Sequence, residues 1–184
     1  MVVFETDRLV LRRLTVEDAP FILRLLNEPS FLQHIGDRGV RNVADAKQYI
    51  LSGPVASYER HGFGLYLVEL KAGGAPIGIC GLLKRDALDD VDLGFAFVPE
   101  SWSKGYAFES ANATLAHGLD VHHLKRIVAI VSPGNVASIN LLVKLGFYFE
   151  RMVLMPGDKD ELKLFARRLG DVKVQGERRR SRRD

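Results

Sequence analysis

Hairpin and crossover connections alternate along this chain, and their order limits its possible folds more than any other feature. Strand-like segments, alternating or continuously apolar, fall at residues 8–14, 64–70, 77–84, 91–98, 126–131, 147–154 and 161–167. Helical segments with capping residues or apolar stripes fall at residues 15–26, 42–51, 54–59, 106–119 and 137–145. Short turns join antiparallel strands, whereas a helix between two strands permits a parallel pair. We therefore predict a mixed α/β (α+β) fold in which a mostly antiparallel sheet of seven strands carries helices on both faces.

The net charge of the chain is concentrated at its C-terminal end. The formal net charge is +3, and residues 170–184 account for it with six basic and three acidic side chains. That segment lacks apolar periodicity, so we expect one domain at residues 1–169 followed by a flexible, arginine-rich tail at 170–184. Such a tail can contact RNA or the ribosome weakly; a solvated terminus without a partner is the alternative.

Composition and hydropathy exclude several classes of protein. At 47% hydrophobic residues the chain can bury a core. No stretch approaches 18 uncharged apolar residues, and acids at positions 5 and 7 interrupt the place of a signal peptide's apolar run. The single cysteine, Cys80, lies in an apolar run, which favours a buried rather than a reactive thiol. We therefore expect a cytoplasmic protein without membrane contact.

The strand at residues 91–98 continues into a glycine-bearing turn and then a helix. One face of this strand combines Asp92 with Gly94 and Ala96, and a glycine inside a strand often marks the close approach of another group. The turn at residues 99–107 leaves the first N–H groups of the following helix unpaired, where the helix dipole favours an anion. This segment predicts a phosphate-binding site.

Four motifs follow one another in this half of the chain: Asp92-Leu93-Gly94, Trp102-Ser103-Lys104-Gly105-Tyr106-Ala107, Asn135-x-x-Ser138 and Leu145-Gly146-Phe147. The opening segment reads Glu5-Thr6-Asp7-Arg8-Leu9-x-Leu11-Arg12. In order and spacing, residues 4–168 resemble the GNAT acyl-CoA N-acyltransferases, and most closely the branch of bacterial ribosomal-protein N-terminal acetyltransferases. The phosphate turn departs from the family pattern at Trp102, where the family has Gln or Arg.

The resemblance implies acetyl-CoA as co-substrate, and the residues themselves lead us to expect no metal. It implies that the CoA pyrophosphate meets the backbone N–H groups of Ser103, Lys104, Gly105, Tyr106, Ala107 and Phe108. It also implies that the backbone of Phe97 and Val98, together with Asn135, bonds to the pantetheine arm. From the residues alone, Gly105 could instead be a simple helix-entry glycine and Asn135 a helix N-cap. His117 and His122 lie five residues apart, which is the wrong spacing for a metal pair on one helix face.

The resemblance also implies direct attack of an amine on the thioester within a ternary complex. Asp92, where many relatives carry glutamate, is the expected base or holds a water that acts as one. Glu109 is the alternative base. Ser138 is expected to donate to the departing thiolate, because Leu142 stands where many relatives carry a tyrosine. A backbone N–H within residues 95–97, at a bulge typical of the family, would meet the oxyanion.

Two functions follow as hypotheses. The first is an N-acetyltransferase that acts on a primary amine, with a protein N-terminal α-amine as one candidate acceptor. An α-amine near pKa 7.7–8.0 needs only a modest base. The alternative is a non-catalytic acyl-CoA-binding sensor or module, since the tyrosine is missing and Asp92 replaces glutamate. No motif identifies the small-molecule or peptide acceptor, and the chain may form a monomer or a homodimer.

Overall fold

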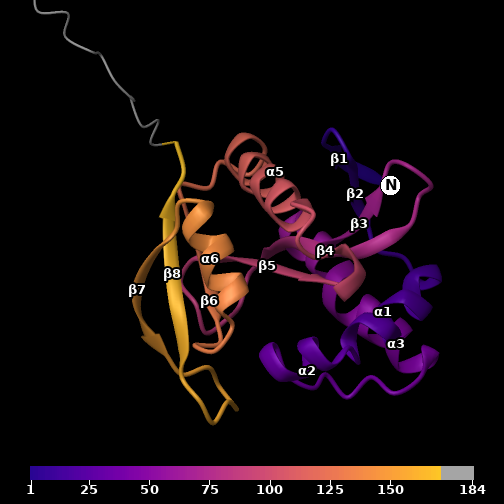
Figure 1. Ribbon diagram of the computed structural model, residues 1–184, viewed down its shortest axis with the longest axis horizontal. Helices are drawn as coiled ribbons and strands as arrows, with labels where there is room; N and C mark the ends of the chain where they lie inside the picture. Colours follow the sequence, from indigo (N-terminus) through magenta and orange to yellow (C-terminus); the bar gives the residue numbers. More distant parts are fainter. Residues whose placement is uncertain (171–184) are drawn as a thin grey trace, which may run out of the picture.

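The computed structural model describes residues 1–170 and contains one sheet of eight strands (Figure 1). The strands run in the spatial order β1-β2-β3-β4-β5-β6-β8-β7. Only β5 and β6 are parallel; every other neighbouring pair is antiparallel. The bounds are β1 Val2–Glu5, β2 Leu9–Arg13, β3 Leu65–Leu70, β4 Pro76–Leu83, β5 Val91–Phe97, β6 Arg126–Val131, β7 Tyr148–Val153 and β8 Leu162–Arg168. The predicted mixed, mostly antiparallel sheet is confirmed.

The eighth strand is β1, which the sequence analysis missed. It has only four residues and pairs with β2 through a register shift between Val2 and Phe4. Its side chains show no clear alternation, so nothing in the sequence marks it as a strand. Phe4 holds it in place by packing against the rings of Tyr66, at 6.0 Å between centroids, and His117, at 4.8 Å.

Six α-helices surround the sheet, namely α1 Ala19–Leu26, α2 Pro29–His34, α3 Val43–Ile50, α4 Ala56–His61, α5 Tyr106–Asp120 and α6 Val136–Lys144. The expected cap at Thr15 is present as a capping box with Asp18, and the Asn42 side chain accepts the Asp45 amide at the start of α3. The short helix α2 is not among the helical segments predicted from the sequence. Pro29, at its first turn, suits a helix start as well as it suits a turn.

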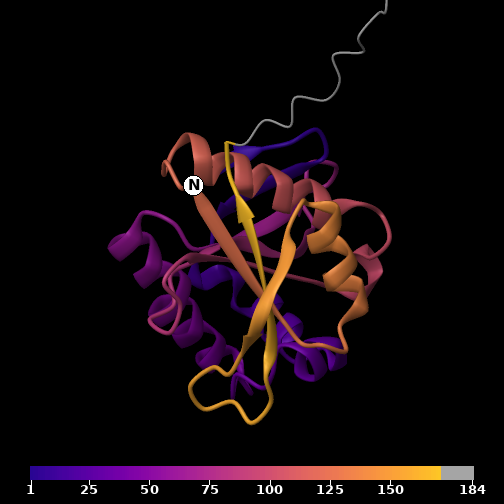
Figure 2. The ribbon, with the colours of Figure 1, turned by 90° about the vertical axis from the view of Figure 1, so that its left-hand side faces the viewer.

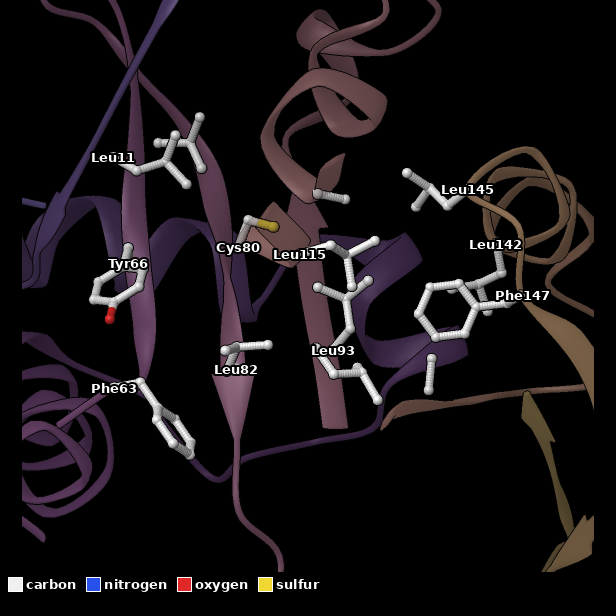
Figure 3. Packing of buried hydrophobic residues seen from close by; sticks show 14 of the residues in the cluster. Leu11, Phe63, Tyr66, Cys80, Leu82, Leu93, Leu115, Leu142, Leu145 and Phe147 are labelled. Carbon is white, nitrogen blue, oxygen red and sulfur yellow. The ribbon is translucent and has the colours of Figure 1, made fainter. Parts of the chain in front are cut away.

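The helices cover both faces of the sheet, as predicted. Alternate residues of β3 belong to the two layers: Tyr66 is part of the apolar cluster that includes Leu115 of α5 and Leu142 of α6, whereas Leu67 is part of the cluster that includes residues of α1 and α3. Figure 3 shows the first layer, in which Cys80 and Leu93 lie among the labelled apolar side chains. Cys80 is fully buried as expected, and burial raises the pKa of its thiol to about 11. The sheet is therefore closed on both sides by apolar packing.

Strand β7 forms one edge of the sheet and pairs with β8 in an antiparallel arrangement. This pair faces the viewer in Figure 2. Of the tail expected at 170–184, residues 171–184 lie outside the described residues. Within residues 1–170, no helix is both long and apolar enough to cross a bilayer.

The parallel pair β5–β6 separates soon after it begins. Its recorded partners are only Val91 with Ile127 and Asp92 with Val128, although β5 continues to Phe97 and β6 to Val131. Beyond Asp92 the two strands diverge (Figure 1). This divergence leaves a gap in the middle of the sheet, and the first residues of α5 and α6 lie beside that gap.

Candidate functional site

Two adjoining cavities fill the gap between the diverging strands. The larger, which we call the loop-side cavity, has a volume of about 600 Å³ and is lined by the turn before α5 and the starts of α5 and α6. The smaller, the strand-side cavity, has a volume of about 260 Å³ and is lined by Asp92, β5, β6 and residues of α2. They share seven lining residues, Phe31, His34, Ile35, Phe95, Ala96, Asn135 and Ser138. The two cavities thus form one continuous cleft.

The turn before α5 has the backbone geometry of an anion site. Gly105 adopts φ +84° and Ser103 φ +58°. Among residues 1–170, no side chain caps the first N–H groups of the 15-residue helix α5. Ser103, Gly105 and the expected residues Tyr106, Ala107 and Phe108 line the loop-side cavity. Unpaired N–H groups and the positive end of the helix dipole therefore meet at the cavity wall. Lys104 is exposed and is not among the lining residues.

Arg8 fixes this turn from outside the cleft. Its guanidinium donates to the Lys104 carbonyl at 3.0 Å and lies over the Tyr106 ring, 4.6 Å from the centroid. It also forms an ion pair with Glu109 at 2.6 Å, and Glu109 accepts the Thr6 hydroxyl at 2.6 Å. Hydrogen bonds from Thr6 and Arg8 lower the pKa of Glu109 against the opposing effect of burial. Glu109 lines neither cavity, and its carboxylate ties the β1–β2 turn to α5.

Alternate residues of β5 direct their backbone groups into the cleft. In an antiparallel pair, residues bonded to the partner strand alternate with residues whose N–H and C=O point to the other edge. The Val98 amide donates to the Ile77 carbonyl of β4 at 3.0 Å, so Phe95 and Phe97 direct theirs toward β6. In agreement, the Trp102 indole N–H donates to the Phe97 carbonyl at 2.8 Å.

The backbone groups of Val98, which were expected to bond to the pantetheine arm, already have partners within the fold. Its amide is taken by Ile77, and its carbonyl accepts the Ser101 amide at 3.0 Å and the Ser101 hydroxyl at 2.7 Å. Val98 is also buried in the core layer of α1 and α3. Phe97 retains an amide toward the cleft, and Phe95, which the sequence analysis did not assign to the arm, offers both backbone groups.

The bulge expected within residues 95–97 is not found in the pairing with β4. The described register runs without interruption from Gly78 opposite Phe97 to Leu83 opposite Asp92. The close neighbour of Gly94 is a side chain: a Cβ there would lie 2.5 Å from Leu83 Cδ1. A regular strand still turns the N–H of Phe95 toward the cleft, so an oxyanion donor does not require the bulge.

Asp92 is a buried carboxylate in the lining of the strand-side cavity. It is 1% exposed, and its Oδ2 accepts the Arg85 Nε–H at 2.6 Å. Within the described residues, its Oδ1 has no hydrogen-bond partner. Burial raises the pKa of Asp92 to about 6, against the opposing charge and hydrogen bond of Arg85. A buried carboxylate with a free oxygen and a pKa near neutrality can accept a proton.

Asn135 and Ser138 lie where the two cavities meet. Asn135 Oδ1 accepts the Ser138 amide at 3.1 Å, so the N-cap reading of Asn135 is confirmed. Both residues also line both cavities, which leaves the Asn135 NH₂ group and the Ser138 hydroxyl available to a ligand. Leu142 is buried in the core and lines the strand-side cavity without a polar atom.

The two histidines whose spacing does not suit a metal pair on one helix face lie close together among aromatic rings. His117 and His122 lie 5.1 Å apart between ring centroids, and the Phe63 ring lies 5.1 Å from His122. Burial lowers the pKa of both imidazoles. In residues 1–170, no group of three or more His, Cys, Asp or Glu side chains could hold a metal ion.

Several known proteins resemble this chain in sequence and in fold. The family model described as "Acetyltransferase (GNAT) domain" matches residues 8–148. The "Uncharacterized N-acetyltransferase YoaA" of Bacillus subtilis (strain 168) is 29% identical over 150 residues, which cover 80% of this chain and 84% of that protein. The crystal structure of an acetyltransferase from Agrobacterium tumefaciens str. C58 superposes with a TM-score of 0.77 at 22% identity, covering 91% of this chain and 94% of that one. RimL, a "Ribosomal L7/L12 alpha-N-protein acetyltransferase" in complex with coenzyme A, superposes with a TM-score of 0.78 at 16% identity, covering 91% and 98%.

Proposed function

Because this chain belongs to the acetyltransferase (GNAT) domain family, we propose that it transfers an acetyl group from acetyl-CoA to a primary amine in one ternary complex. One observation carries the proposal. The anion-type turn before α5 and the buried carboxylate of Asp92 lie at opposite ends of one cleft, and Ser138 stands at the junction. Such a cleft can bind a thioester from one end and an amine from the other.

The loop-side cavity suits acetyl-CoA. Its volume of about 600 Å³ lies within the range of roughly 300–1,000 Å³ that is usual for ligand pockets. We assign the pyrophosphate to the N–H groups at Gly105–Phe108 and the pantetheine arm to the inward-facing backbone of Phe95 and Phe97. Lys144 lines the same cavity and adds a positive charge that Lys104 does not supply.

In the proposed reaction, the amine nitrogen attacks the thioester carbonyl and the carbon–sulfur bond breaks. The proton of the amine passes to Asp92, directly or through a water, and the sulfur leaves as a thiolate that accepts a hydrogen bond from the Ser138 hydroxyl. The Phe95 N–H meets the oxyanion of the tetrahedral intermediate. An acceptor α-amine near pKa 7.7–8.0 matches a base near pKa 6 better than a lysine near 10.4 does. A protein N-terminal α-amine therefore remains a candidate acceptor, and RimL, a structural neighbour, is described as acting on one.

The proposal is tested with acetyl-CoA and a panel of amines. Acetyl-CoA should raise the melting temperature of the protein, because a ligand that binds only the native state stabilises it. Release of free thiol should then depend on the amine. Absence of a shift at millimolar acetyl-CoA would contradict the cofactor assignment. A shift without thiol release from any amine would instead support the acyl-CoA-binding sensor.

Replacement of Ser138 with alanine tests the assignment of the thiolate donor. We expect kcat to fall about fivefold, with the affinity for acetyl-CoA unchanged, since one hydrogen bond to the leaving sulfur is lost. Thiol release under saturating substrates measures kcat, and calorimetry measures affinity. Asn140→Ala is the matched control, because Asn140 is an exposed polar residue of the same helix that lines neither cavity. Equal kcat values for the two variants would remove Ser138 from the mechanism.

A further inference from the structure

A third cavity continues the strand-side cavity away from the loop-side cavity. This rear cavity has a volume of about 280 Å³ and lies between the α3–α4 segment and the end of β4. It shares four lining residues with the strand-side cavity, Tyr49, Leu65, Leu83 and Arg85. An acceptor that reaches Asp92 from this side therefore passes the side chains of both cavities.

Positive charge dominates these two cavities. Arg38 and Arg85 line the strand-side cavity, and Arg60, Lys84 and again Arg85 line the rear cavity. Asp92 is the sole carboxylate among all their lining residues, which belong to the described part of the chain. Since Arg85 already neutralises Asp92 through their ion pair, the remaining cations leave the path to Asp92 electropositive.

Two of these cations have no internal counter-ion. Within residues 1–170, neither Arg38 nor Arg60 has a carboxylate within 4.0 Å. Lys84 differs, because its ammonium donates to the backbone carbonyls of Leu88 and Asp89. Arg38 and Arg60 are therefore free to bind an anionic group of a ligand.

Two acids on nearby loops, Asp37 and Asp90, are already paired with other arginines. Asp37 forms an ion pair with Arg41, and Asp90 pairs with Arg126 at 2.9 Å. These carboxylates therefore do not neutralise the two free arginines.

Tyr49 adds a neutral hydrogen-bond donor between the two cavities. Tyr49, Arg38 and Arg85 all line the strand-side cavity. Burial raises the pKa of the Tyr49 phenol, and the charges of Arg38 and Arg85 act in the opposite direction. Asp92 Oδ1, buried and without a partner, supplies the acceptor of hydrogen bonds at the other end. The lining of the two cavities thus combines hydrogen-bond donors and positive charges with one proton acceptor, the carboxylate of Asp92.

We propose that these two cavities bind an acceptor amine that carries a carboxylate a few atoms from the amine nitrogen. The amine faces Asp92, and the carboxylate is attracted by the positive charges of Arg38 in the strand-side cavity and Arg60 in the rear cavity. The inference rests on the proposed acetyl transfer and narrows its acceptor. Amino acids and peptides with an acidic first residue have this chemistry. Polyamines and other polycations lack the carboxylate, and the positive charges that line the two cavities oppose their entry.

Matched acceptors that differ only in charge test the proposal. The pairs are the peptide amides Glu-Ala-Ala and Gln-Ala-Ala, and free glutamate with glutamine amide, so that a peptide source and a free amino acid source are read separately. We expect kcat/KM to be roughly tenfold higher for the acidic member of at least one pair, through KM rather than kcat. The advantage should shrink between low and high salt, since the arginines are exposed. Spermidine should be a poor acceptor.

The arginine variants locate the effect. Arg38→Gln and Arg60→Gln should each reduce the acidic-to-neutral ratio of kcat/KM about threefold. Arg41→Gln is the control, because Arg41 is an exposed arginine of the same loop that is already paired with Asp37 and lines neither cavity. Direct titration of Glu-Ala-Ala amide into the protein with bound coenzyme A gives a second readout that needs no turnover.

The outcomes separate this inference from the proposed function. Acetyl transfer with equal rates for acidic and neutral acceptors would overturn the inference and leave the acetyltransferase standing. An unchanged ratio in both Arg38→Gln and Arg60→Gln would overturn the assignment of the carboxylate to these side chains. Failure of acetyl-CoA to bind at all would be a failure of the proposed function itself.

Discussion

Asp92→Asn is expected to lower kcat for acetyl transfer about a hundredfold, while the affinity for acetyl-CoA stays within twofold of wild type. Loss of a positioned general base typically costs between roughly 10² and 10⁴ in rate. Asparagine keeps the shape of the side chain and an oxygen for Arg85 but cannot take a proton. Thiol release at saturating substrates measures the first quantity, and calorimetry with acetyl-CoA measures the second.

The pH dependence of the same pair of proteins supplies an independent reading. Burial raises the pKa of Asp92 to about 6, so the carboxylate is ionised and able to act as a base above pH 6 and becomes protonated below it. The wild-type rate should therefore fall as the pH drops through about 6, and the residual rate of Asp92→Asn should lack this step. Asp90→Asn, at a half-buried acid paired with Arg126 outside the cleft, is the control and should keep both the rate and the step. Wild-type kcat in Asp92→Asn would exclude Asp92 as the base.

Gly105→Ala should weaken acetyl-CoA binding by about tenfold or more. Gly105 has φ +84°, and a Cβ there would lie 3.3 Å from Nη2 of Arg8. Nη1 of the same side chain donates to the Lys104 carbonyl and so holds the turn. A left-handed conformation costs an alanine about 1–2 kcal/mol. The turn is expected to relax toward an ordinary conformation, which moves the N–H groups assigned to the pyrophosphate. The dissociation constant from calorimetry measures the effect.

Gly157→Ala is the matched control for this substitution. Gly157 has φ +88° with no atom within 4 Å of the added Cβ, and it lies in the β7–β8 turn, away from the cleft. Both variants should lose a similar amount of thermal stability from backbone strain, and only Gly105→Ala should lose affinity for acetyl-CoA. Equal affinities would show that the turn before α5 does not hold the coenzyme.

The sequence predicted the features that depend on local patterns. Alternation and glycine placement predicted the strand and the turn before α5, and one unrecognised strand, β1, accounts for the difference between seven and eight strands. The alternation of residues in this strand also placed Asp92 on the opposite face from its apolar neighbours Val91 and Leu93. These features need only the preferences of neighbouring residues, so a single sequence can carry them.

Features that depend on distant pairing could not be predicted. Arg85 reaches Asp92 because the hairpin register places Leu83 opposite Asp92, and that register is not written in the strand itself. The same holds for Val98, whose side and partner depend on β4. Trp102 was noted only as a departure from the family pattern, yet its indole occupies the Phe97 carbonyl. In each case the sequence does not show which segment of the chain lies next to the residue in the fold.

The clasp made by Thr6, Arg8 and Glu109 links the start of the chain to the turn before α5. None of these three side chains lines the cleft, yet together they brace the wall assigned to the coenzyme. Loss of the contacts that Thr6 and Arg8 make would therefore loosen the wall assigned to the coenzyme, although both residues lie outside the cleft.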